Sequence, residues 1–162
     1  MASRTLAVAD VFATALQTFL TTNTIAATVS REYVPDVDDD AFDDWIDSAT
    51  PMKVYVVPLK KKTALHTRGR DLTDYSFAVI FAEKYTSAGV PTKAWMDARV
   101  GYVELAEDQF GDIRNAFDST YGKLWAVESE VTLVFDADTM REEHAFWSVW
   151  ALTLRESVGT GV

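Results

Sequence analysis

The stretch Asp74-Tyr75-Ser76-Phe77-Ala78-Val79-Ile80-Phe81-Ala82, residues 74–82, decides the fold of this chain. Apolar side chains alternate between its two sides when it is extended, because successive side chains of a strand point to opposite faces. One side carries Tyr75, Phe77, Val79 and Phe81, and the other carries Ala78, Ile80 and Ala82. This period of two residues predicts a β-strand, around which the rest of the chain is interpreted.

Four further segments are predicted to be strands. Residues 24–33 alternate apolar and polar side chains, and residues 52–59 form an apolar run in which Pro58 predicts a sheet edge or a bulge. The other two segments are residues 124–135 and 144–155. The last is apolar on both sides, which is expected of a central strand or of one that another subunit covers.

Two segments, residues 5–21 and about 92–116, have the apolar period of about 3.6 residues that is typical of a helix. Gly111 weakens the second helix by about 1 kcal/mol relative to alanine. Residues 136–143 are expected to be a polar connection. The resulting order of elements predicts an α+β fold, with a single, mostly antiparallel sheet of about five strands and two helices packed on one face.

The composition limits the size and the class of the protein. In a chain of 162 residues, we expect a single α+β domain over residues 1–156 and a flexible tail at 157–162. The lack of cysteine excludes a disulfide framework and a cysteine-based zinc site, and it agrees with a reducing cytoplasm. We expect no membrane segment, because no apolar run approaches about 18 residues, and no signal peptide.

The net charge of −10 argues against a nucleic-acid-binding protein. Neutralised phosphates provide most of the affinity of such proteins, and an acidic surface repels them. Repulsion would suit a channel that DNA must pass without sticking. DNA is therefore expected only as passing cargo.

Residues 36–50 form a strongly acidic segment. The residues that we expect at an interface here are Asp36, Asp38, Asp40, Asp43, Asp44, Trp45 and Asp47. Four of these aspartates match positions 1, 3, 5 and 12 of a calcium-binding EF-hand loop, but Ala41 replaces its glycine and Asp47 its longer glutamate. The segment is therefore interpreted as a solvated acidic loop.

No catalytic, metal-binding or cofactor-binding pattern stands out. His144 next to Glu142 and Glu143 comes nearest to a metal site, but the spacing of known zinc motifs is missing. No serine lies in a G-x-S-x-G frame, and no glycine-rich loop could hold a phosphate. We therefore expect no enzyme activity, no cofactor and no metal.

Residues 60–72 are the one region in which bases outnumber acids, and they are predicted to be a loop. Its basic residues are Lys60, Lys61, Lys62, Arg68 and Arg70. In an assembling protein this loop would meet an acidic surface, such as residues 36–47 of a neighbouring copy, and head-to-tail contacts of this kind can close a ring. The alternative is a mobile, solvated loop on a monomer.

Short phrases along the chain resemble a known family. They are Leu6-Ala7-Val8-Ala9-Asp10-Val11, Arg31-Glu32-Tyr33-Val34-Pro35, Val54-Tyr55-Val56-Val57-Pro58, Thr67-Arg68-Gly69-Arg70-Asp71, Asp74-Tyr75-Ser76-Phe77-Ala78-Val79 and Phe146-Trp147-Ser148-Val149-Trp150-Ala151-Leu152-Thr153-Leu154. Together with the order of elements over residues 5–156, they make the chain similar to the tail-terminator, or tail-completion, proteins of long-tailed phages. The acidic segment 36–50 has no place in that pattern.

The resemblance implies a structural viral tail protein without catalytic residues. Such a protein forms a ring, expected to be a homohexamer, that caps the tail tube, stops its polymerisation and joins it to the head connector. Its partners would be the tail tube protein and a connector or stopper protein, without a membrane. It would act in phage assembly in the host cytoplasm and remain in the virion at the head–tail junction. The alternatives are another neck or head-completion protein, or a small non-enzymatic binding domain of a host cell.

Overall fold

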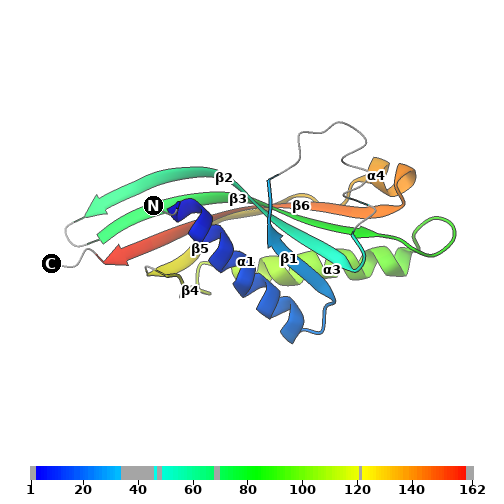
Figure 1. Cartoon of the computed structure of the whole chain (residues 1–162), viewed down its shortest axis with the longest axis horizontal. Helices are drawn as coiled ribbons and strands as arrows, with labels where there is room; N and C mark the ends of the chain where they lie inside the picture. Colours follow the sequence, from blue (N-terminus) through cyan, green and yellow to red (C-terminus); the bar gives the residue numbers. More distant parts are fainter. Residues whose placement is uncertain (1–2, 34–45, 47–48, 68–69, 121, 160–162) are drawn as a thin grey trace.

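A computed structural model of the chain describes residues 3–33, 46, 49–67, 70–120 and 122–159; for residues 64–67 and 159 it describes the backbone alone. It has an α+β fold, as the sequence predicts (Figure 1). The elements are α1 (Arg4–Thr22), β1 (Ala27–Arg31), β2 (Met52–Thr67), β3 (Arg70–Lys84), α3 (Lys93–Phe110), β4 (Phe117–Asp118), β5 (Lys123–Leu133), α4 (Ala137–Glu142) and β6 (Ala145–Gly159).

The strands form one six-stranded sheet in the order β1-β2-β3-β6-β5-β4, curved into a half-barrel. Only the β1–β2 pair is parallel, and the other four pairs are antiparallel. The expected count of five strands is one too low, because the two residues of β4 are too few for a periodic signal. A parallel β1 is possible because the long chain between Arg31 and Met52 leaves room for a crossover.

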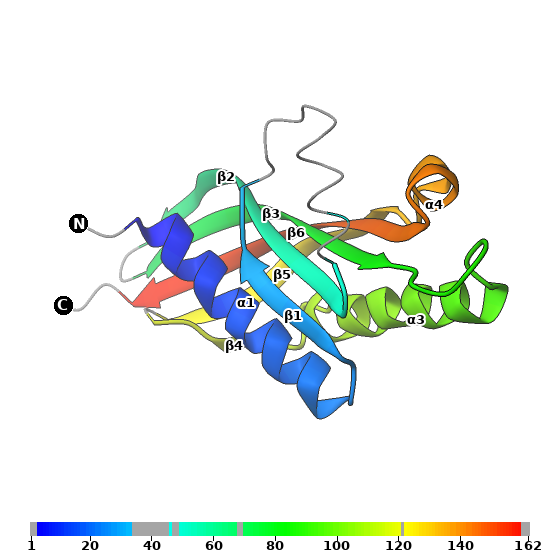
Figure 2. The same cartoon turned by 45° about the vertical axis from the view of Figure 1, so that its right-hand side comes forward.

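The main core lies between the sheet and the helices α1 and α3, which cover the same face (Figure 2). Phe12 of α1 is fully buried at its centre, with ring centroids 5.5 Å from Phe110 of α3, 6.1 Å from Phe77 of β3 and 6.2 Å from Trp150 of β6. We call this side of the sheet the helix face. The other side, the opposite face, has a smaller apolar cluster that includes Ile46.

Helix α1 is long and apolar enough to cross a membrane by length and composition alone. The sequence predicts no membrane segment, because polar residues interrupt this stretch. In the structure its buried residues Val8, Phe12, Leu16 and Leu20 all belong to the core under the sheet. That packing is typical of the core helix of a folded domain.

The predicted loop at residues 60–72 is wrong. Residues 60–67 continue β2 and residues 70–72 begin β3, with Thr67 opposite Arg70 at the end of a long hairpin. Backbone pairing with β3, which is itself paired with β6, holds the basic residues extended although they lack apolar alternation.

Three other predicted boundaries need correction. The second helix ends at Phe110 rather than near 116, and Gly111 caps it at a point where a side chain would collide with Ser129 of β5. The polar connection at 136–143 contains the short helix α4, which Asp136 caps by accepting hydrogen bonds from the backbone N–H groups of Asp138 and Thr139. Part of the predicted tail, up to Gly159, belongs to β6; the remainder lies outside the described residues.

Candidate assembly surfaces

The structure places four of the predicted interface residues. Lys60, Lys61 and Lys62 lie in β2, and Arg70 is the first residue of β3. Arg68 lies outside the described residues. So do all the predicted residues of the acidic segment: Asp36, Asp38, Asp40, Asp43, Asp44, Trp45 and Asp47.

The three lysines alternate between the two faces of the sheet. Lys61 lies opposite the buried core residue Tyr75, with its Nζ 6.0 Å from the ring centroid, so it belongs to the helix face. Lys60 and Lys62 lie opposite Ser76 and Asp74, on the opposite face. All three side chains are exposed, so the strand carries positive charge on both of its sides.

These lysines border a strand edge that has no partner strand in the part of the chain that the structure describes. β1 pairs only with Met52–Val56, and from Val57 onward no described strand lies on the outer side of β2. A register shift between Pro58 and Lys60 leaves Leu59 as an extra residue, and its side chain is 64% exposed. We call residues 57–63 the basic edge, because they include three lysines and no acid.

The other side of the sheet ends in a second edge to which the described residues add no partner strand. β4 pairs only with Lys123 and Leu124, so no described strand lies outside β5 from Trp125 to Leu133. Glu128 lies opposite Thr153, and Glu130 lies opposite Ala151; both are exposed on the opposite face. We call residues 125–133 the acidic edge, because they include two glutamates and no base.

A groove of about 340 Å³ runs between the acidic edge and α3, on the helix face. It is lined by Val100, Val103, Glu104, Glu107, Ser129, Glu130, Val131 and Val134. The groove therefore combines an apolar floor with carboxylates at its rim. The glutamates of the acidic edge lie on the opposite face, and Glu104 and Glu107 of α3 add negative charge on the helix face.

Hydrogen bonds fix the floor of this groove. The Nε1 of the buried Trp150 donates to the Oγ of Ser129 at 2.9 Å, and that hydroxyl donates to Oε1 of Glu107 at 2.7 Å. The hydroxyl of Ser129 is thus both acceptor and donor, which a serine can satisfy with a single oxygen. The contact ties β5 to α3 and orients Glu107 at the groove.

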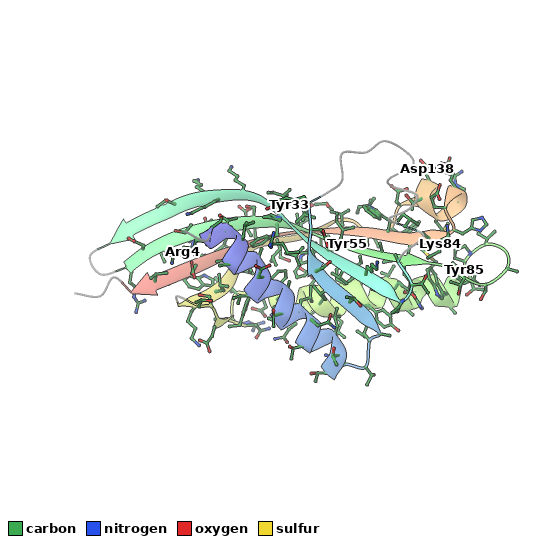
Figure 3. All side chains as sticks on the ribbon, viewed as in Figure 1. Arg4, Tyr33, Tyr55, Lys84, Tyr85 and Asp138 are labelled. Carbon is green, nitrogen blue, oxygen red and sulfur yellow. The ribbon has the colours of Figure 1, made fainter. Side chains whose placement is uncertain are left out.

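The buried carboxylate of Glu156, near the end of β6, links three other parts of the fold. Glu156 is fully buried; its Oε2 accepts hydrogen bonds from Nε of Arg4 at 3.0 Å and from the hydroxyl of Tyr75 at 3.2 Å, and Ser119 donates to its Oε1 at 2.6 Å. Arg4 lies at the start of α1, over the end of the sheet (Figure 3). Burial of Tyr75, and then the charge of Glu156, raise the pKa of Tyr75 to about 12. The cluster is structural, because every group in it holds another element in place.

Two more ion pairs stiffen the framework between the edges. Arg99 of α3 makes a two-pronged contact with Glu83 of β3, at 2.8 and 2.9 Å. Arg155 of β6 makes a similar contact with Asp74 of β3, at 2.7 and 2.9 Å. Two-pronged arginine–carboxylate contacts are geometrically specific, so both fix the relative placement of neighbouring elements.

The described residues contain no group of three histidines or acids that could hold a metal ion, and that includes the neighbourhood of His144. The features that stand out are instead two strand edges of opposite charge. The acidic edge and its groove are not among the surfaces predicted from the sequence. The available signal is the spacing of Glu128 and Glu130 by two residues, as on one side of a strand, and of Glu104 and Glu107 by three, as on one side of a helix. Comparison of the sequence with known protein families and with curated proteins finds no match.

Proposed function

We propose that this protein is a tail terminator of a long-tailed phage, a structural protein whose copies form a ring on the end of the tail tube. The observation that carries the proposal is that one sheet has two edges of opposite charge, the basic edge of β2 and the acidic edge of β5, and that no strand among the described residues pairs with either. A surface that fits a different surface of the next copy makes a head-to-tail contact, and such contacts close into rings.

The charge of the edges supports assembly into a ring over pairing into a symmetric dimer. A symmetric dimer brings the same surface of both copies together. Two basic edges, or two acidic edges, would then repel each other, whereas a basic edge and an acidic edge attract. The same charges keep the free subunit from aggregating through its exposed strands, as edge lysines do in other sheets.

In the proposed role the ring caps the finished tail tube, stops the addition of further tube subunits and offers a surface to the head connector or stopper protein. The ring is proposed to be a homohexamer in the virion, assembled in the host cytoplasm, with DNA as passing cargo. The net charge of −10 supports a lumen that does not retain DNA. No enzymatic step, cofactor or membrane forms part of this function.

The test is the mass and shape of the particle, measured by light scattering and negative-stain imaging across protein concentration, with and without purified tail tubes. We expect a ring, either free or formed when the 18.1 kDa subunit meets a tube end. Tubes grown in its presence should stop at a capped end. A subunit that stays monomeric at all concentrations and leaves tube growth unchanged would contradict the proposal. A ring that binds connectors but ignores tubes would instead assign the protein to another position in the neck.

A further inference from the structure

We infer that the basic edge of one copy joins the acidic edge of the next as an antiparallel strand pair, with Lys60 opposite Glu130 and Lys62 opposite Glu128. The inference rests on the proposed ring and names the contact that would build it. Its occupant is a second copy of this chain, chosen because the lysines of the basic edge complement the glutamates of the acidic edge on the opposite face and the carboxylates of α3 on the helix face.

The direction of the strands follows from the topology. β2, β3, β6 and β5 are neighbours, and each consecutive pair is antiparallel, so β2 and β5 run in opposite directions. Rotation about an axis along the strands preserves these directions. When β2 of one copy meets β5 of the next, the pair is therefore antiparallel, and the alternation continues from one subunit to the next.

The register follows from the charges. In an antiparallel pair the residue numbers of opposite residues add to a constant, and side chains that lie opposite each other share a face. Lys60 and Lys62 lie on the opposite face, as do Glu128 and Glu130. Shifting the pair by two residues in either direction leaves only one lysine opposite a glutamate, so only the proposed register pairs both.

The bulges of the two strands are compatible with this register. β2 is regular from Lys60 to Thr63, between its two register shifts. β5 is regular from Glu128 to Val131, again between two shifts. In the proposed register the regular residues Lys60–Lys62 of one copy meet the regular residues Glu128–Glu130 of the next, where backbone hydrogen bonds can form in series.

The helix face is matched in the same register. Lys61 comes opposite Ser129, whose hydroxyl donates to Glu107 at the groove. The exposed Leu59 comes next to Val131 on the apolar floor of the groove. One copy thus offers a leucine and a lysine to a groove that has valines and glutamates, so both apolar burial and ion pairing favour the contact.

Charge reversal tests the contact. We expect that K60E/K62E and E128K/E130K each raise the concentration for half-assembly by about 100-fold or more, because each variant places like charges opposite each other. Their mixture in equal amounts should assemble again, since each variant then meets a complementary edge. A chain with all four changes should also assemble. Circular dichroism of each variant checks that the subunit is folded.

Cysteine cross-linking tests the register in the otherwise cysteine-free chain. In the variant K62C/E128C, the two new cysteines of one copy lie three strands apart, roughly 14 Å, so oxidation can link only different copies. We expect a ladder of covalent oligomers, and none from the control K62C/T132C, whose partner residue is about 13 Å out of register. If the wild type forms rings but the charge variants assemble as well as it does, or K62C/E128C gives no ladder, this contact is overturned and the proposed ring stands. Absence of any wild-type assembly, in solution or on tubes, would overturn the ring itself.

Discussion

The two outer sides of the sheet are built alike and charged differently. On one side β1 covers only Met52–Val56 of β2, and on the other β4 covers only Lys123 and Leu124 of β5. Each strand continues beyond its short neighbour as an edge without a described partner. The basic edge has three lysines and no acid, whereas the acidic edge has two glutamates and no base. The difference shows how one chain can present two strand edges without favouring a symmetric dimer, because each edge repels the same edge of another copy.

The comparison also separates what the edges share from what each has alone. Both depend on the core beneath the central strands, in which Phe12 touches β3, β6 and α3. Only the acidic edge depends on the hydrogen bonds through Ser129, and only the basic edge has an exposed leucine. Substitution of Phe12 should therefore affect both edges, substitution of Ser129 the acidic edge, and substitution of the exposed Leu59 the basic edge.

The largest effect is expected from Phe12→Ala, which removes the ring at the centre of the shared core. Loss of a buried phenylalanine and the cavity that it leaves typically cost about 3–5 kcal/mol. We expect a loss of this size in the free energy of unfolding, measured by denaturant titration with tryptophan fluorescence. The control Phe135→Ala, at a side chain that is 42% exposed, should change it by less than about 0.5 kcal/mol. Equal small effects at both positions would contradict the assigned core.

A smaller loss is expected from Ser129→Ala, which leaves the buried Nε1 of Trp150 without its acceptor. An unsatisfied buried donor costs about 1–3 kcal/mol, so the free energy of unfolding should fall by that amount. Hydrogen exchange should increase in β5 and the end of α3 before it increases in β2. The control Thr132→Ala removes a longer, 3.3 Å contact at an exposed residue of the same strand and should have little effect. Identical exchange in the two variants would show that the Ser129 contacts do not hold the acidic edge.

Leu59→Ala should leave the folded subunit unchanged and weaken assembly. Its side chain is 64% exposed in the single chain, so its removal takes away little burial in the subunit. In the proposed contact it enters the groove, and we expect the concentration for half-assembly to rise by about tenfold. Val90→Ala, at a side chain that is 63% exposed and lies on neither edge, is the matched control. A similar response of both variants would remove Leu59 from the contact.

The smallest effect is expected from Tyr75, whose buried hydroxyl contributes to the stability of the folded subunit in a pH-dependent way. Its pKa is raised to about 12 in the folded protein, so the folded state keeps its proton after the unfolded chain has begun to lose it near pH 10. This contribution is therefore complete below about pH 10 and is lost as the pH rises toward about 12. We expect Tyr75→Phe to lower the free energy of unfolding by about 1 kcal/mol at neutral pH, where its hydrogen bond to Glu156 is lost. Between pH 10 and 12 the difference from the wild type should shrink; a constant difference would contradict the assigned pKa.

The sequence predicts the central helices and strands well, because their buried side chains recur at the spacing of a helix or of a strand. Residues 74–82 and 5–21 show their buried sides directly, and α+β architecture follows from the order of such segments. The continuation of β2 through Lys60–Lys62 could not be predicted in this way, because those residues are polar and are extended only through pairing with β3. The parallel placement of β1 is likewise a property of the crossover and not of the five residues in the strand.

The candidate surfaces were predictable only in part. Consecutive lysines concentrate positive charge in any conformation, and from them the sequence predicts an interface that stays a prediction. The carboxylates at the groove come from two elements, Glu104 and Glu107 from α3 and Glu130 from β5, and only folding brings these together. The buried Glu156 gave no signal, because one acid in a strand looks the same whether it faces solvent or Arg4.

The most direct measurement is hydrogen exchange of the backbone amides before and after assembly, on tail tubes if the free subunit does not form rings. Joining of the two edges predicts that protection increases together in residues 57–63 and 125–133, with little change in β3 and β6, which are already paired. Protection of only one of these segments, or of neither while rings form, would contradict the pairing of the basic edge with the acidic edge.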